Sequence, residues 1–322
     1  MRRRDIIALA GTAILWRRAV AQEPGRRYRI AYLGPSPPNA PPQHALLAAL
    51  AKAGFIDGKN LAVDQRGFGQ PPARFAEAAA LLVAAKPDVI VCGGPDAGRA
   101  AQAATTAIPL IVNSDDLVGE GVVASIAHPG GNTTGVSIHS PDLDGKRFEI
   151  LLELLPGVRH VDALAGSDTA NDRHFALLQE AARARGVALT IRTAANYAAI
   201  APAIEAAKNA GAQGLNVLGS ALLFGNRQAI FERCQALRLP AIYQWPENAH
   251  EGGLIGYGPS ITGIYAEQIS RLAVRILQGT KPGDLPVEQP DKFVLAINTK
   301  VAQALGVAIP PLLLTRADEV IE

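Results

Sequence analysis

The stretch Pro87–Thr105, PDVIVCGGPDAGRAAQAAT, decides the fold of this chain. Its first part is a short, β-branched apolar run that ends in two glycines. Its second part is rich in alanine and places apolar residues at three- and four-residue spacing. The first pattern is typical of a buried parallel strand and the second of an amphipathic helix. The stretch therefore predicts one strand–helix unit of an α/β protein.

The same unit recurs along the chain. Around the first stretch, the pattern predicts strands at 28–34, 60–67, 108–114 and 133–139, with helices at 42–54 and 73–86. It then restarts, with strands predicted at 159–166, 187–193, 212–219, 239–245 and 251–258 and helices at 171–186, 197–211 and 227–238. Strands that alternate with helices at this spacing form parallel sheets covered on both faces. Two successive sets predict two doubly wound parallel-sheet lobes.

The residues that follow each strand are the candidate ligand contacts, because open parallel sheets bind ligands beyond the carboxyl ends of their strands. In the first lobe these candidates are Ser36, Gly94, Pro95, Asn113, Ser114 and Asp116. In the second lobe they are Ser167, Asp168, Ser220, Tyr243, Trp245 and Tyr257. Small, polar and aromatic residues of this kind suit the binding of a small polar molecule by backbone amides, hydroxyls and apolar walls.

Two of these groups have a second interpretation. The aromatic residues Tyr243, Trp245 and Tyr257 form either a stacking wall for a ligand or ordinary packing at the edge of a lobe. Asp116 either binds the ligand or caps a helix predicted over 117–127. The residue pattern leaves both choices open.

Sequence motifs for catalysis are absent. The chain has no G-x-S-x-G elbow, no phosphate-binding lysine loop and no G-x-G-x-x-G after its first strand. Its six histidines are scattered without the i,i+4 spacing of a zinc site. We therefore expect neither an enzyme nor a bound cofactor or metal.

The stretch His128–Ser137, HPGGNTTGVS, resembles a phosphate-binding loop only superficially. Such a loop runs from a strand through glycines to the amino end of a helix, where backbone amides point at the anion. Here the glycines precede a predicted strand, and we expect them to end the helix predicted over 117–127. The motif is therefore predicted to be structural, with a hinge crossing from Ser137 onward.

The first 21 residues have the composition of a secretion signal. Three arginines precede a short apolar run, and AVAQ supplies a cleavage site after Ala21. Removing residues 1–21 takes away five arginines and one aspartate and leaves 26 basic against 28 acidic residues, which gives no electrostatic reason to bind nucleic acid. The alternative is an uncleaved amphipathic tail. We expect a periplasmic protein whose two cysteines, Cys92 and Cys234, are buried and unpaired.

Four long stretches resemble a family of ABC-transporter substrate-binding proteins that includes binders of tryptophan and other aromatic amino acids. They are DLVGEGVVASIAHPGGNTTGVS (116–137), DLDGKRFEILLELLPGVRHV (142–161), LPAIYQWPENAHEGGLIGYGPS (239–260) and KFVLAINTKVAQALGVAIPPLLLTRADEVIE (292–322). The resemblance implies the two-lobed, hinged fold of type I periplasmic binding proteins. It also implies capture of a solute for an ABC permease and its ATPase subunit. As cleft contacts it implies Ser36, Gly94, Asn113, Asp116, Tyr243 and Tyr257.

Two departures from the family pattern bear on the solute. Leu117 stands where members usually have proline, and Ala165–Ser167 stands where a Trp-Asn-Pro run is common. Losing a tryptophan and an amide changes both stacking and hydrogen bonding, so aromatic amino acids are one candidate class beside aromatic acids.

The expected organisation is a signal peptide at 1–21, a first lobe of 28–138 plus about 259–285, and a second lobe of 139–258 plus about 286–322. We expect a monomer that closes around its solute. Two alternatives remain, a ligand-sensing domain that serves a receptor and an enzyme on the same fold.

Overall fold

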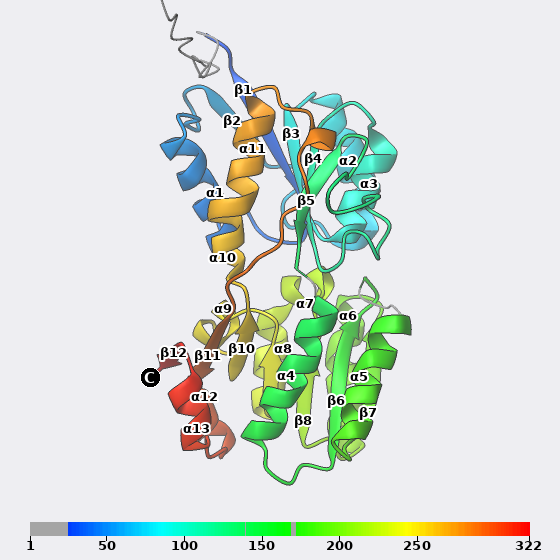
Figure 1. Ribbon diagram of the computed structural model, residues 1–322, viewed down its shortest axis with the longest axis vertical. Coiled ribbons are helices and arrows are strands. Elements are labelled where there is room, and N and C mark those ends of the chain that lie inside the picture. Colours follow the sequence, from blue (N-terminus) through cyan, green and yellow to red (C-terminus); the bar gives the residue numbers. More distant parts are fainter. Residues whose placement is uncertain (1–24, 139, 169–171) are drawn as a thin grey trace, which may run out of the picture.

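The computed structural model describes residues 25–138, 140–168 and 172–322. Two α/β lobes lie one above the other along the long axis of the molecule (Figure 1). The predicted signal peptide lies outside the described residues. Within them, no helix is long and apolar enough to cross a membrane.

The first lobe contains a five-stranded parallel sheet with the strand order β2-β1-β3-β4-β5. Its strands are β1 (Tyr28–Leu33), β2 (Leu61–Asp64), β3 (Val89–Gly93), β4 (Leu110–Ser114) and β5 (Thr133–Ser137). Its helices are α1 (Pro41–Lys52), the short η1 (Pro72–Arg74), α2 (Phe75–Ala84) and α3 (Pro95–Ala104). The sheet has a separate apolar core on each face, as the predicted doubly wound arrangement requires.

The second lobe contains a seven-stranded sheet with the order β12-β11-β10-β9-β8-β6-β7. Its strands are β6 (His160–Gly166), β7 (Ala188–Ala194), β8 (Gly214–Val217), β9 (Ala241–Tyr243), β10 (Ile255–Gly258), β11 (Val294–Asn298) and β12 (Glu319–Ile321). Its helices are α4 (Ser140–Leu154), α5 (Asp172–Ala184), α6 (Tyr197–Asn209), α7 (Ala221–Gly225), α8 (Arg227–Ala236), α9 (Glu247–His250), α12 (Thr299–Leu305) and α13 (Pro311–Arg316). Strand β11 runs antiparallel to β10, an exception to the all-parallel sheet expected from the sequence.

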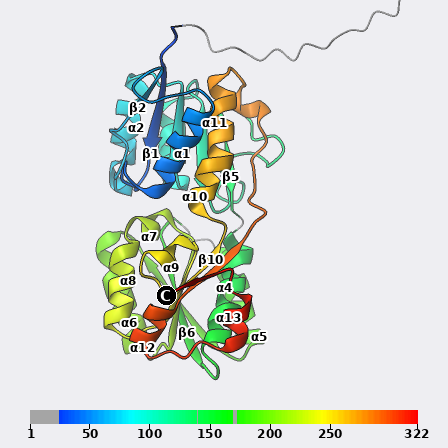
Figure 2. The same cartoon turned by 90° about the vertical axis from the view of Figure 1, so that its left-hand side faces the viewer.

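The chain crosses between the lobes at three places that lie on the same side of the molecule in Figure 2. The first follows β5, and the second leads from β10 into α10 (Ile261–Gly263), the π-helical turn η2 (Ile264–Ile269) and α11 (Ser270–Leu277). The third begins after η3 (Pro282–Asp284), where Glu288 pairs with Val136 before the chain reaches β11. From these crossings we propose that the first lobe comprises residues 28–138 and about 259–285, and that the second comprises 139–258 and about 286–322.

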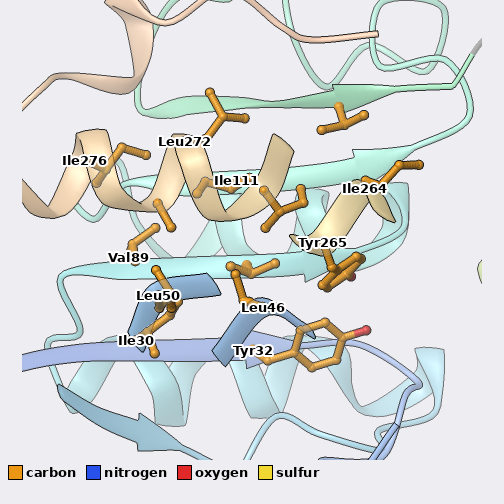
Figure 3. Close-up of a cluster of buried hydrophobic side chains, with 14 of the residues drawn as sticks. Ile30, Tyr32, Leu46, Leu50, Val89, Ile111, Ile264, Tyr265, Leu272 and Ile276 are labelled. Carbon is orange, nitrogen blue, oxygen red and sulfur yellow. The ribbon is translucent and has the colours of Figure 1, made fainter. Parts of the chain in front are cut away.

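The helical segment after the second crossing packs onto the first lobe. Helix α11 packs beside α1, and its Leu272 and Ile276 belong to the same buried cluster as Leu46 and Leu50 of α1 (Figure 3). The rings of Tyr32 and Tyr265 lie together at one end of this cluster, which is the end that faces the second lobe. A segment remote in sequence therefore completes the first lobe and delivers a tyrosine to its cleft edge.

The helix predicted over 117–127 is wrong. The chain instead forms successive turns, and Asp116 accepts a hydrogen bond from the backbone amide of Gly119 at 2.9 Å. Gly130 and Gly131 have φ angles of 76° and 56° and form the turn into β5, so they do not end a helix. Cys92 and Cys234 are buried and unpaired, as predicted.

Candidate ligand-binding site

A cavity of about 510 Å³, its mouth included, lies between the lobes at the carboxyl ends of the strands. The first lobe supplies residues that follow β1, β3 and β4, and the second lobe supplies residues that follow β8 and β9. The fold therefore brings together the post-strand segments of two separate sheets.

Seven of the twelve residues predicted from the sequence line this cavity. They are Ser36, Gly94, Pro95, Asn113, Ser114, Ser220 and Trp245. The first five come from the first lobe and directly follow, or end, its central strands. Of the second lobe's six candidates, only Ser220 and Trp245 reach the cavity.

Asp168 lies outside the cavity but holds Ser220, which lines it. The Ser220 hydroxyl donates to Asp168 Oδ1 at 2.6 Å and accepts from the amide of Leu223 at 3.1 Å, so that it caps α7. Asp168 Oδ2 accepts from the amide of Leu222 at 3.2 Å. Burial raises the pKa of Asp168, although these hydrogen bonds oppose the shift. The carboxylate holds the amino end of α7 against the cavity without lining it.

The other four candidates lie elsewhere. Tyr243 is buried in the second lobe's core, edge-on to Phe231 with 4.9 Å between the ring centroids. The ring of Tyr257 packs near Phe293, and Ser167 donates to the carbonyl oxygen of Ala195 at 3.3 Å. Asp116 caps its turn. For Tyr243 and Tyr257 the structure thus shows the packing that the sequence left as the alternative.

Three aromatic residues that sequence reasoning missed also line the cavity. They are Tyr32, Phe224 and Tyr265, and they join Trp245. Phe224 meets Trp245 edge to face at 6.3 Å between centroids. Tyr32 and Tyr265 are buried and share a hydrogen bond, and burial raises the pKa of both phenols, so both stay neutral. The cavity is therefore walled by aromatic rings on both lobes.

Two glycines make room for the Tyr32 ring. A Cβ at Gly34 would lie 2.6 Å from the Tyr32 hydroxyl oxygen, and one at Gly93 would lie at 2.3 Å. Any larger residue would displace the phenol from the cavity edge. The small residues after β1 and β3, which suggested ligand contacts, thus also seat a side chain that no pattern had singled out.

Two buried amide oxygens of the cavity lining have no hydrogen-bond partner among the described residues. They are Gln43 Oε1 and Asn113 Oδ1, on side chains that are 3% and 8% exposed. An unsatisfied buried acceptor costs about 1–3 kcal/mol. A ligand with hydrogen-bond donors would recover this cost, which makes the two amides candidate contacts.

Carboxylates concentrate on the first lobe's side of the site. Asp115 lines the cavity and accepts a hydrogen bond from Gln244 Nε2 of the second lobe at 2.7 Å. Behind it, Glu120 shares a hydrogen bond with the Ser114 hydroxyl. Burial, reinforced by the charge of Asp115, raises the pKa of Glu120 to about 8. This part of the site disfavours further negative charge.

A buried arginine holds the second lobe's side of the hinge. Arg147 of α4 pairs with Asp144 at 2.5 Å, and both side chains are fully buried. Its guanidinium also donates to the carbonyl oxygen of Tyr257 at 2.7 Å and to that of Gln244 at 3.3 Å. One side chain thus ties the helix after the first crossing to the strand before the second crossing and to the Gln244 loop.

The lobes touch around the cavity. A Cβ at Gly94 would lie 2.6 Å from the methyl group of Ala221, and one at Gly225 would lie 2.9 Å from Pro35 Cβ. Together with the bond between Asp115 and Gln244, these contacts join the two lobes beside the cavity.

Comparisons with known proteins agree with this architecture. A family model described as ABC transporter substrate binding protein matches residues 42–321. A tyrosine-binding protein of Clostridioides difficile is 24% identical over 266 residues, which are 80% of this chain and 74% of the relative. A conserved domain protein from Vibrio cholerae has a TM-score of 0.81 at 26% identity, covering 92% of this chain and 99% of its own. A Streptococcus pneumoniae ABC domain in complex with L-Trp has a TM-score of 0.78 at 23% identity, covering 92% of this chain and 100% of its own.

Proposed function

The chain belongs to the family of ABC transporter substrate-binding proteins, and we propose that it captures a small aromatic, amino acid-like solute between its two lobes. This is a family of binding proteins and not of enzymes, and it implies a small-molecule ligand and an ABC transporter as partner. Proteins of the family are extracellular or periplasmic.

The observation that carries the proposal is the composition of the interlobe cavity. Aromatic rings from both lobes line it, together with Ser36, Ser114 and Ser220 and two unsatisfied amide oxygens. Aromatic walls supply affinity through apolar contact and stacking, and the polar groups orient a ligand. The tyrosine-binding relative and the L-Trp complex support an aromatic amino acid-like ligand.

Capture by closure follows from where the contacts lie. A ligand that touches both lobes stabilises the closed form by the difference between its affinities for the closed and open states. A few kcal/mol of such difference is enough to shift the population. We propose that the closed form then docks on an ABC permease driven by an ATPase subunit.

The remaining parts of the proposal concern the setting. Residues 1–21 would direct export to the periplasm and be removed after Ala21. The mature chain would act as a monomer, without a cofactor and without nucleic acid.

A thermal-shift screen tests the function. Residues 22–322 are unfolded and refolded to remove carried-over solute, and then melted with aromatic amino acids, aromatic amines, aromatic acids and small carboxylates. At a hundredfold excess over the Kd, a ligand stabilises the native state by about 2.7 kcal/mol. We expect a rise in Tm with aromatic members of the panel.

A matched pair of variants links any shift to the cavity. Phe224→Ala removes a ring of the cavity wall and should abolish most of the shift. Phe293→Ala removes a ring that is 40% exposed and does not line the cavity, and should leave the shift unchanged. Equal loss in both variants, or a panel without any shift, would contradict the proposal, and consumption of a compound would return the enzyme alternative.

A further inference from the structure

The charge of the cavity lining narrows the class of solute. Among the described residues that line the cavity, Asp115 is the only charged one, and no lysine, arginine or histidine is present. Among these residues, a ligand carboxylate would find hydroxyls and backbone amides but no cation. A ligand cation would find the carboxylate of Asp115 at the wall of a cavity that aromatic rings from both lobes line.

The unsatisfied acceptors lie on the same lobe as this carboxylate. Asn113 is two residues before Asp115 at the end of β4, and Gln43 is on α1. Their unpartnered oxygens, Asn113 Oδ1 and Gln43 Oε1, are buried and can each accept a hydrogen bond. An ammonium group carries three donors and no acceptor, which matches one carboxylate and two amide oxygens.

The side chains around Asp115 also favour a positively charged ligand group over a negatively charged one. The partly buried side chain of Glu120 lies behind Ser114 and is close enough to Asp115 and Asp116 to sense their charge. Arg99 of α3 donates to the carbonyl oxygen of Glu120 at 3.2 Å, and its guanidinium is paired with Asp96 at 2.6 Å. A cationic ligand group would be attracted by the carboxylates of Asp115 and Asp116, whereas an anionic one would be repelled by them.

We propose that the solute is recognised through a protonated amine, held by Asp115, Asn113 and Gln43, and that a ligand carboxylate is dispensable. This rests on the proposed function and specifies its ligand as an aromatic amine, with or without a carboxylate. Asp115 also accepts a hydrogen bond from Gln244 Nε2 of the other lobe. Binding of the amine would therefore take place at a contact between the two lobes.

Isothermal titration of residues 22–322 with two sets of ligands that share a ring tests this proposal. The first set is tyramine, L-tyrosine and 3-(4-hydroxyphenyl)propionate, and the second is tryptamine, L-tryptophan and indole-3-propionate. In at least one set, the amine should bind at least as tightly as the amino acid and at least tenfold more tightly than the propionate. A propionate that binds as tightly as the amine would overturn the proposal while the function stands. If no member of either set binds, the proposed function fails and this inference with it.

A charge variant and its control make the assignment specific. Asp115→Asn keeps the size of the side chain and should weaken amine binding at least tenfold while leaving propionate binding equal or tighter. Asp57→Asn makes the same change on the exposed surface of the same lobe and should alter neither. The melting temperatures of both variants without ligand show that they fold. Unchanged amine affinity in folded Asp115→Asn would overturn the role of this carboxylate.

Discussion

The two lobes line the same cavity in different ways. In the first lobe, the predicted residues at the ends of β1, β3 and β4 meet the cavity directly, as Ser36, Gly94 and Asn113 do. In the second lobe, α7 and the loop after β9 supply the lining, and other side chains hold both in place. The first lobe thus contacts the cavity with the ends of its strands. The second lobe contacts it with α7 and the loop after β9, which hydrogen bonds with Asp168 and Arg147 hold in place.

This difference shows when a residue that follows a strand can be expected to line the cavity. Tyr243 is the last residue of β9, and strand alternation turns it into the core with Ala241, while Gln244 and Trp245 continue to the cavity. Asp168 follows β6, but α7 lies between it and the cavity. A residue near a strand end reaches the ligand only if no other segment covers it.

The largest effect should come from breaking the second lobe's support. Arg147→Met leaves Asp144 buried without its partner, which costs about 3–5 kcal/mol in the free energy of unfolding. Urea unfolding of the two proteins measures the change. Arg316→Met, which removes an exposed pair with Glu153, should change stability by less than about 1 kcal/mol. A loss at position 147 as small as that of the control would show that the network does not hold this lobe.

A smaller effect is expected where the lobes meet. Gly94→Ala places a methyl group 2.6 Å from that of Ala221, at a φ of 100°. Crowding of this kind costs about 1–3 kcal/mol, so ligand affinity should fall roughly ten- to hundredfold. Titration with the tightest ligand of the panels measures this loss.

Two further variants separate closure from backbone strain. Gly121→Ala has a similar positive φ of 69° but no atom within 4 Å of the added carbon, and should keep full affinity. Adding Ala221→Gly to Gly94→Ala removes the opposing methyl group and should restore part of the binding. An affinity loss in Gly121→Ala equal to that in Gly94→Ala would mean that closure is not what the first variant blocks.

The smallest effect concerns pH and the first lobe. Glu120 has a pKa of about 8 in the folded protein against an ordinary value of 4.5, so the folded state keeps a proton that the unfolded chain releases. The contribution of Glu120 to stability is therefore fully favourable below the lower value and is lost as the pH rises through the upper one. Glu120→Gln stays uncharged and should gain at least about 1 kcal/mol on the unchanged protein between about pH 5 and pH 9.

Thermal unfolding across this range checks the expectation. Glu77→Gln, at an exposed position of α2, serves as the control and should follow the pH profile of the unchanged protein. Parallel profiles for Glu120→Gln and the unchanged protein would show that Glu120 titrates at its ordinary value.

The sequence predicted the strands of both sheets up to β10 closely, because buried parallel strands leave contiguous apolar runs such as Val89–Gly93. It did not predict β11 and β12, which are short and lie within a motif noted only for its resemblance. The helix expected after Asp116 failed because the chain turns at Gly119 and Gly121, where the hydrogen bond of Asp116 closes a single turn. The spacing of apolar residues alone does not reveal that the chain forms a single turn here and not a helix.

The site was predictable only in part for a related reason. Strand ends locate Asn113 and Ser114. Tyr265, however, comes from a π-helical turn and lies 151 residues after Ser114, so only tertiary packing brings it beside Tyr32. Gln43 lies in the first turn of α1, where an amide ordinarily faces solvent. Tyr32 gave one usable signal, since glycines follow both β1 and β3 and leave space for a large neighbouring ring.

The most direct test of the central claim is a crystal structure of residues 22–322 with the tightest ligand of the two panels. The account predicts a single ligand between the lobes, with its ring among Tyr32, Phe224, Trp245 and Tyr265 and its ammonium group at Asp115. A ligand bound outside the interlobe cavity, or bound there with its amine turned away from Asp115 toward the second lobe, would contradict it.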